Sequence, residues 1–182
     1  TGTTDDAGYC FTSAYNRDGD EIYTVILNST TTDQRFTDTA TLANWYYGHK
    51  VTVAIANTQE KTANGNPLMA RIGQTDWTDK TIDATLADPT AQATVFSLAG
   101  EVTEKVSYDD LSGTVHVGDK VGSVTLKQDG TKIAVMGLVA DEEGSGPNPI
   151  EWLLVKLDRL GRRIDNRPLT AESETVAKVP EM

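Results

Sequence analysis

The sequence is poor in cysteine and in positive charge, and it has no long hydrophobic run. Its single cysteine, Cys10, excludes an internal disulfide and a zinc site built on cysteine ligands. The 16 Lys and Arg residues stand against 27 Asp and Glu, a net charge of −11, which argues against a nucleic-acid partner because phosphate binding needs clustered cations. No stretch of about 18 apolar residues predicts a membrane-spanning helix, and no signal peptide is recognisable.

Histidine is equally scarce, and no group of acidic residues has the spacing of a metal site. His49 follows a predicted helix, where a cation at the helix end is expected, and His116 stands alone in an alternating segment. The acidic groups at 109–110 and 141–143 match no calcium-binding loop and are expected in solvated turns, as is the pair at 5–6. The sequence therefore predicts no metal and no cofactor.

What the chain has instead is sequence that favours β structure. Of its 182 residues, 38% are hydrophobic and 24% are charged, which is typical of a globular protein with a core. Its 15 glycines and its many Thr and Val residues favour strands and turns over helices. The fold class expected is mainly β with some α, divided into one or two domains.

The N-terminal part predicts two strands joined by a hairpin. Residues 8–15 alternate in character along the chain, and 16–20 contain the Asp-Gly pair that a tight turn favours. Residues 22–27 are apolar on both faces, which predicts a central strand. Cys10 is expected as a small, buried apolar side chain within the first strand.

A helix is predicted next, over residues 33–47, with Thr32 as its N-cap and Gly48 at its end. One face carries a stripe of apolar and small residues at helical spacing: Phe36, Ala40, Ala43 and Tyr47. A hairpin with one helix is too small to be stable alone. Residues 1–48 are therefore predicted to be the remnant of a larger domain of sheet and helices.

From His49 onward, short β runs alternate with turn residues at intervals of roughly ten, which is the pattern of a sandwich or small barrel. Residues 49–140 are predicted to form a β-sandwich-like domain. Its candidate strands are 50–56, 68–74, 80–86, 94–98, 102–108, 123–128 and 132–139.

The last part, 141–182, is predicted to hold a linker, a short amphipathic helix and a mobile tail from 168. The helix, over 150–164, is basic and carries Trp152. That composition suits a helix lying on an anionic membrane surface, while packing on the protein or on a second copy is the alternative. Its apolar face is made of Ile150, Leu153, Leu154, Leu157, Leu160 and Ile164.

The opening segment, Thr1-Gly2-Thr3-Thr4-Asp5-Asp6-Ala7-Gly8-Tyr9-Cys10, resembles the Lys-Thr-Gly strand of serine-type D-alanyl-D-alanine carboxypeptidases, the low-molecular-weight penicillin-binding proteins. Three later segments, 111–115, 117–124 and 129–134, resemble the β-domain that follows the catalytic domain in that family. The resemblance implies the C-terminal fragment of such an enzyme, beginning inside the Lys-Thr-Gly motif. It would comprise the last strands and helix of a transpeptidase-like α+β domain, followed by the β-domain.

The resemblance also implies where substrate would bind. The hydroxyl of Thr1 would bind the terminal carboxylate of a D-Ala-D-Ala peptide or a penicillin, and Gly2 would let the substrate backbone approach the strand. The backbone N–H of Thr3 would supply one donor of an oxyanion hole. The chain has no Ser-x-x-Lys and no Ser-x-Asn, and Lys61-Thr62-Ala63 is no Lys-Thr-Gly. With the serine nucleophile and the motif lysine missing, this fragment alone is expected to be inactive.

The parent enzyme implied by the resemblance would remove terminal D-Ala from peptidoglycan stem peptides through a serine acyl-enzyme, and β-lactams would acylate it. Its expected location is extracytoplasmic, at the outer face of the cytoplasmic membrane. The expected partners are the stem peptide, β-lactams, the missing N-terminal half of the catalytic domain and a membrane surface bound through 150–164. No nucleic acid is expected among them.

Two other interpretations remain open from the sequence. Thr1 could be the nucleophile of an N-terminal threonine hydrolase, activated by its own α-amine. The chain could also be a non-catalytic β-sandwich that acts as a spacer or binding module.

Overall fold

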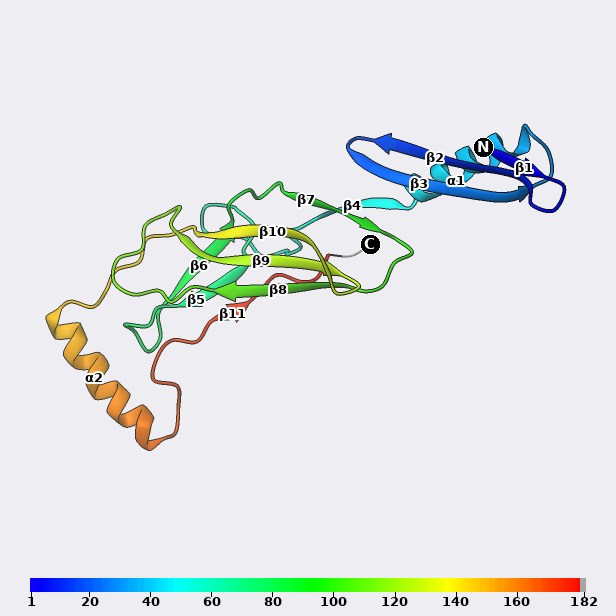
Figure 1. Ribbon diagram of the computed structural model, residues 1–182. Coiled ribbons are helices and arrows are strands. Elements are labelled where there is room, and N and C mark those ends of the chain that lie inside the picture. Colours follow the sequence, from blue (N-terminus) through cyan, green and yellow to red (C-terminus); the bar gives the residue numbers. More distant parts are fainter. Residues whose placement is uncertain (181–182) are drawn as a thin grey trace. The chain divides into compact units, whose positions relative to one another are not determined.

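The computed structural model describes residues 1–180 and is mainly β, with two helices (Figure 1). The chain divides into two compact units. The first contains Thr1–Lys50 and Phe96–Leu98, and the second contains Val51–Val95 and the chain from Ala99 onward.

The first unit is built on a three-stranded antiparallel sheet in the order β1-β2-β3. Its strands are β1 (Gly2–Thr4), β2 (Gly8–Arg17) and β3 (Asp20–Ser29). The hairpin predicted from the Asp-Gly pair is present, and both turn residues have positive φ, 55° at Asp18 and 84° at Gly19. That geometry matches the right-handed twist of the strands on either side.

The prediction that 22–27 forms a central strand is wrong, because β3 lies at the edge of this sheet in the described chain. Its alternate side chains Tyr23, Val25 and Leu27 are 70%, 57% and 71% exposed. An apolar run on both faces can mean a strand buried on both sides or a strand with one face uncovered. Here only one face is covered, by the helix that follows.

That helix, α1 (Gln34–Gly48), packs on β2 and β3. It begins one residue later than predicted: Asp33 takes the cap position without a side-chain hydrogen bond, while the Thr31 hydroxyl accepts from Gln34 N at 3.0 Å. The side chains it buries fully are Thr39 and Ala43. Larger side chains contact the sheet at the ends of the helix: Phe36 packs edge-on against Phe11 of β2 with ring centres 4.8 Å apart, and the Tyr47 hydroxyl donates to Tyr15 O and Asp20 O.

The second unit holds a six-stranded antiparallel sheet in the order β11-β5-β6-β10-β9-β8 and a two-stranded ladder of β4 with β7. Every strand predicted in 49–140 is present, with ends shifted by up to three residues. The observed bounds are β4 (Lys50–Ala54), β5 (Ala70–Gly73), β6 (Thr81–Leu86), β7 (Gln92–Phe96), β8 (Val102–Tyr108), β9 (Lys120–Gln128) and β10 (Thr131–Ala140).

Side chains from both ladders enter one hydrophobic core, which explains why the ladders stay together. Val53 and Val95 come from the two-stranded ladder, while Ile72, Leu126 and Leu138 come from the large sheet, and each is at most 5% exposed. Burial of apolar side chains contributes about 25 cal/mol for each Å² removed from water. This core is the main source of stability in the second unit.

The segment 141–148 is packed, not the solvated linker that its composition predicts. Asp141 is 6% exposed, Gly144 pairs with Val115, and the Trp77 indole donates to Ser145 O at 2.8 Å. The segment ends at Asn148, whose side chain caps α2 (Pro149–Ile164) through a complete capping box with Glu151.

The chain after α2 returns to the sheet, so the prediction of a mobile tail is wrong for the described residues 168–180 (Figure 1). Strand β11 (Glu174–Thr175) pairs with β5, and Ala171 N donates to Trp77 O at 2.9 Å. Gly73 makes this possible, because a Cβ there would clash with Ala171 O. Residues 181–182 of the predicted tail lie outside the described chain.

Candidate functional site

Strand β1, which contains the Thr-Gly-Thr segment, lies at an edge of the first sheet. It pairs with β2 on one side only, with Gly2 opposite Cys10 and Thr3 opposite Tyr9. Thr1, Gly2 and Thr3 are all exposed. An edge strand has backbone N–H and C=O groups free to pair with an added strand, so β1 can accept an extended peptide.

The turn between β1 and β2 fixes the direction of this edge. Thr4 Oγ1 accepts from Ala7 N at 3.0 Å, and Asp5 and Asp6 lie between them, as the turn prediction placed them. Gly8 has a φ of 61°, and a Cβ at that position would clash with the Asn28 side chain. A glycine is therefore needed where the chain enters β2 against β3.

Arg35, at the start of α1, reaches the same edge and was missed by the sequence analysis. Its Nη1 donates to Thr3 Oγ1 at 3.3 Å, and its guanidinium lies 4.9 Å from the centre of the Phe36 ring and 5.9 Å from that of Tyr9. Its Nε is buried without a hydrogen-bond partner. The guanidinium thus brings a positive charge beside β1.

Hydroxyl groups hold α1 in the position that brings Arg35 to β1. Ser13 Oγ lies 2.8 Å from Thr24 Oγ1 and 2.6 Å from Thr39 Oγ1, and the two threonines also hydrogen-bond to each other. At the first turns of α1, Gln34 and Ser29 donate to Asp38 and hold the pKa of its carboxyl below its usual value. These hydrogen bonds hold the helix against the sheet, together with the packing of Phe36 on Phe11.

Other residues singled out in the sequence take structural positions in the first unit. Thr1 is exposed, and no described residue hydrogen-bonds to it, so its own α-amine is the base that a threonine nucleophile would use. Cys10 is half-buried, with its Sγ 3.3 Å from Ala7 O. His49 is the C-cap of α1, where its Nδ1 lies 2.7 Å from Trp45 O.

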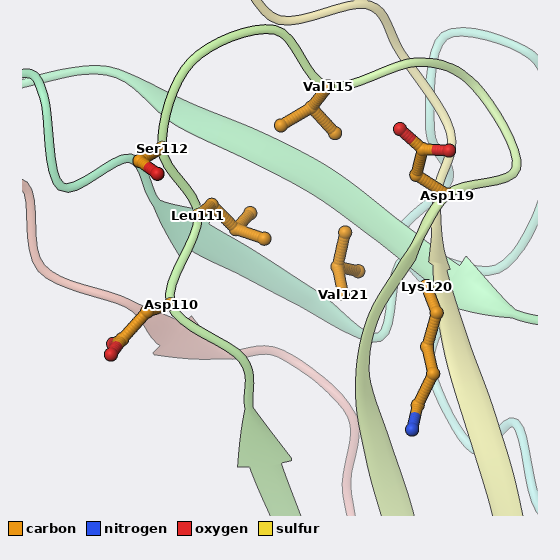
Figure 2. A pocket seen from close by; sticks show the side chains of 7 residues that line it. All are labelled: Asp110, Leu111, Ser112, Val115, Asp119, Lys120 and Val121. Carbon is orange, nitrogen blue, oxygen red and sulfur yellow. The ribbon is translucent and has the colours of Figure 1, made fainter.

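A small open pocket of about 270 Å³ lies in the second unit, at the end of β8 and the start of β9. Figure 2 shows Leu111, Val115 and Val121 between Ser112 and Asp119, while Asp110 and Lys120 extend away from them. The Asp119 carboxylate accepts from the backbone N–H of His116 at 2.8 Å, so this acid is used by the loop itself. The predicted surface position of His116 is observed.

Two carboxyl groups of the second unit are buried against expectation. Asp141 accepts from Asn66 Nδ2 at 2.9 Å, while its second oxygen has no partner in the described chain. Glu104 lies opposite Leu126 with both carboxyl oxygens unpartnered, and burial raises its pKa to about 7. Among residues 1–180, no group of three or more His, Cys, Asp or Glu side chains is placed to hold a metal ion.

Helix α2 turns its apolar face outward and its polar face toward its own unit. Val155 is buried, and Arg159 donates to Thr75 O at 2.7 Å and to Leu169 O at 2.9 Å. The six residues of the predicted apolar face are all more than half exposed: Ile150, Leu153, Leu154, Leu157, Leu160 and Ile164. Over the described chain, neither helix combines the length and the apolarity needed to cross a bilayer.

No family model matches the chain, and no curated protein sequence matches it either. Among solved structures it is similar to penicillin binding protein 5 from Haemophilus influenzae, with 17% identity and a TM-score of 0.41 over 79% of the chain and 41% of that protein. It is also similar to the D-alanyl-D-alanine carboxypeptidase DacD from Francisella tularensis, with 21% identity and a TM-score of 0.40 over 80% of the chain and 35% of that protein. The chain thus spans less than half the length of either protein.

Proposed function

We propose that this chain supplies the substrate-aligning strand of a D-alanyl-D-alanine carboxypeptidase, while the serine nucleophile comes from residues outside it. The observation that carries the proposal is the position of β1, a sheet edge with the sequence Thr-Gly-Thr and the Arg35 guanidinium beside it. The substrate class is a peptide that ends in D-Ala-D-Ala, such as a peptidoglycan stem peptide.

In this proposal the peptide pairs with β1 as an added strand, and Gly2 lets its backbone approach closely. The terminal carboxylate binds the Thr1 hydroxyl and the Arg35 guanidinium, whose Nη1 lies 3.3 Å from Thr3 Oγ1 on β1. Hydrogen bonds to charged groups contribute about 1.5–3 kcal/mol each, so Arg35 supplies a large part of the binding energy. The Thr3 N–H then faces the scissile carbonyl as one oxyanion donor.

A peptide-binding measurement tests this role without requiring turnover. A lysyl-D-Ala-D-Ala peptide is titrated into the chain by calorimetry, with the L-Ala-L-Ala peptide and the C-terminal amide as controls. We expect weak binding of the D-peptide alone, lowered about tenfold or more in Arg35→Gln. Arg17→Gln is the matched control, since Arg17 hydrogen-bonds Asn44 in the same unit. Equal binding of all three peptides, or no effect of Arg35→Gln, would contradict the proposal.

The uncovered face of the first sheet supports a partner for this unit. Tyr23, Val25 and Leu27 are exposed on the face opposite α1, and both β1 and β3 are edges. Contiguous exposed apolar side chains on a sheet mark a surface that another layer covers. We propose that the remaining part of the catalytic domain, which carries the nucleophile, covers this face.

Covalent labelling separates this proposal from a threonine hydrolase. A fluorescent penicillin is expected to leave the 182-residue chain unlabelled, because the chain has no Ser-x-x-Lys. A threonine-directed electrophile is expected to leave the mass of Thr1 unchanged. Label on any residue of the isolated chain would show that it contains its own nucleophile.

A second role is favoured by α2. Its outward apolar face cannot be explained by packing within its own unit, which contacts the polar face instead. We propose that α2 lies on a membrane surface with this face in the lipid. Because the proposed substrate is a peptidoglycan stem peptide, the proposed location is the outer face of the cytoplasmic membrane.

Co-sedimentation with lipid vesicles tests the membrane role. Binding is expected for the natural sequence and is expected to fall about 30-fold in Leu157→Asp, because burying a leucine side chain contributes about 2 kcal/mol. Thr103→Asp, an exposed position on β8, is the control for added negative charge. Failure of the natural chain to bind any vesicle would remove this role and leave the peptide-binding proposal standing.

A further inference from the structure

The two flanks of the α2 apolar face differ in charge. Counted at 100° per residue, Lys156 and Arg163 fall on one border of the apolar stripe, together with Trp152. Glu151 and Asp158 fall on the other border. The helix is therefore basic along one edge of its lipid-facing surface and acidic along the other.

The acidic flank is already used within the protein. Glu151 accepts from Asn148 N at 2.9 Å in the capping box. Asp158 accepts from Arg162 Nε at 2.6 Å, and Thr78 and Arg162 together hold the pKa of its carboxyl below its usual value. These carboxylates have partners in the protein, so the basic flank is the one left for an external ligand.

The basic flank borders a hollow of about 270 Å³ that is lined by Lys156, Arg159, Leu160 and Arg163. No carboxylate lines this hollow. Its floor is apolar at Leu160, which continues into the exposed stripe at Leu157 and Ile164. Such a hollow suits a ligand with an anionic group on an apolar chain.

The three cations remain uncompensated in the described chain. Lys156 Nζ lies 3.6 Å from the centre of the Trp152 ring, which leaves its charge without a carboxylate partner. Arg159 hydrogen-bonds to the main-chain carbonyls of Thr75 and Leu169, which orient its guanidinium without neutralising it. Arg163 has no ion pair among residues 1–180.

This concentration of positive charge is unusual in an acidic protein. Five of the 16 cationic side chains lie between 156 and 167, in a chain whose net charge is −11. The protein as a whole is repelled by an anionic surface, but screening limits that repulsion to about 8 Å at physiological salt. A side chain that touches the surface is therefore governed by the local charge of α2.

We propose that Lys156, Arg159 and Arg163 form a binding site for the phosphate of an anionic phospholipid, whose acyl chain lies along Leu160 and Leu157. The inference rests on the proposed membrane role of α2 and adds to it the chemistry of the lipid. Arg159 acts also as a positioning residue, because its two carbonyl contacts hold the basic flank at a fixed rotation relative to the unit. Trp152 lies on the same flank, where an indole suits the lipid interface.

Vesicle binding by the full chain tests the site. Phosphatidylglycerol vesicles and phosphatidylcholine vesicles are compared for the natural sequence and for the double variant Lys156→Gln/Arg163→Gln. The control variant is Lys127→Gln/Lys132→Gln, which removes two exposed cations from the β9–β10 hairpin with the same change in net charge. We expect the first double variant to bind phosphatidylglycerol vesicles about 10–30-fold more weakly and the control to bind unchanged.

Each other outcome has a distinct meaning. The phosphate site is overturned if the natural chain binds both kinds of vesicle equally and the first double variant binds as well as the natural chain. If Leu157→Asp then abolishes this binding, the membrane role remains. No binding to either vesicle overturns the membrane role and the site together. If inorganic phosphate lowers vesicle binding more than sodium chloride at the same ionic strength does, the site binds a free anion and the lipid assignment is overturned. A dimer in solution that Leu157→Asp abolishes assigns the apolar face to a second copy instead.

Discussion

The two helices of this protein use amphipathic sequence in opposite ways. Helix α1 turns its small residues Thr39 and Ala43 into the sheet and leaves Trp45 49% exposed. Helix α2 turns charged residues toward its unit and leaves six large apolar residues exposed. A helical apolar stripe therefore identifies one face of a helix, but not what that face contacts.

The contacts that fix each helix explain the difference. The α1 interface combines a network of the hydroxyl groups of Ser13, Thr24 and Thr39 with the ring contact of Phe36 on Phe11. Helix α2 is held to its unit by the hydrogen bonds of Arg159 and by the buried Val155 side chain. The segment after the helix returns to the sheet, where β11 pairs with β5. Polar contacts help to anchor both helices, and the apolar face of α2 is left exposed.

The largest effect is expected from placing the same charged residue on each helix. Ala43→Asp buries an unpaired carboxylate under α1 and is expected to destabilise the first unit by about 3–5 kcal/mol. Leu157→Asp adds a carboxylate to an exposed position of α2 and is expected to change stability by no more than about 0.5 kcal/mol. Urea unfolding followed by resolved amide resonances of each unit measures both. Equal destabilisation by the two variants would show that the α2 face is buried in solution.

The return of the chain after α2 is tested at Gly73. An alanine there meets Ala171 O and is expected to displace the 168–177 segment and to cost the second unit about 1–3 kcal/mol. Gly161→Ala is the control, since a Cβ at that helical position has open space and is expected to stabilise by about 0.5–1 kcal/mol. Hydrogen exchange at Val176 and Ala177, which both donate to Met69 O, should rise in Gly73→Ala alone.

The lowered pKa of Asp38 gives the first unit a contribution to stability that is lost at acid pH. Glu104 gives the second unit a pH dependence of the opposite sign. Its pKa is about 7 in the folded protein and 4.5 in the unfolded reference, so the folded state holds the proton more tightly. Stability is therefore highest below about pH 4.5, falls as the pH rises toward 7 and is level above that. Glu104→Gln should remove this fall and stabilise the second unit at pH 8 by about 1–2 kcal/mol, a value reduced for partial solvent exposure. A difference between variant and natural protein that is equal at pH 4 and pH 8 would contradict the burial of this carboxyl.

The smallest effect is expected from one hydroxyl of the α1 network. Thr39→Val keeps the shape of the side chain and removes a hydrogen bond to Ser13 and Thr24, which is expected to cost about 1 kcal/mol. Thr41→Val, an exposed position on the same helix, should be nearly neutral. Thermal unfolding of the first unit distinguishes the two, and equal effects would show that the network does not hold α1.

Local sequence signals predicted most elements of this fold. The Asp18-Gly19 turn, the seven strands of 49–140 and both helices follow from patterns within about ten residues of chain. The local errors are small, such as the cap of α1 at Asp33 instead of Thr32, and the larger errors concern contacts between distant segments. Sequence alone cannot show that β3 is an edge, because its neighbours depend on topology, or that β11 pairs with β5 about a hundred residues earlier.

The candidate site shows the same limit. The Thr-Gly-Thr segment drew attention to β1, but Arg35 lies 32 residues away in the chain and no motif connects them. Asp141 was predicted in a solvated turn because it is the first of three adjacent acidic residues. The local sequence does not reveal that the Asn66 side chain, 75 residues away, donates a hydrogen bond to it. Side chains that meet through the fold become visible only when the fold is known.

The central claim, that β1 aligns a peptide ending in D-Ala-D-Ala, is tested most directly by residue-resolved amide NMR of the chain during titration with that peptide. We expect chemical-shift changes at Gly2, Thr3 and Thr4 and at the Arg35 side chain, and none of these changes with the L-Ala-L-Ala peptide. Changes confined to other strands, or the same changes with both peptides, would contradict it.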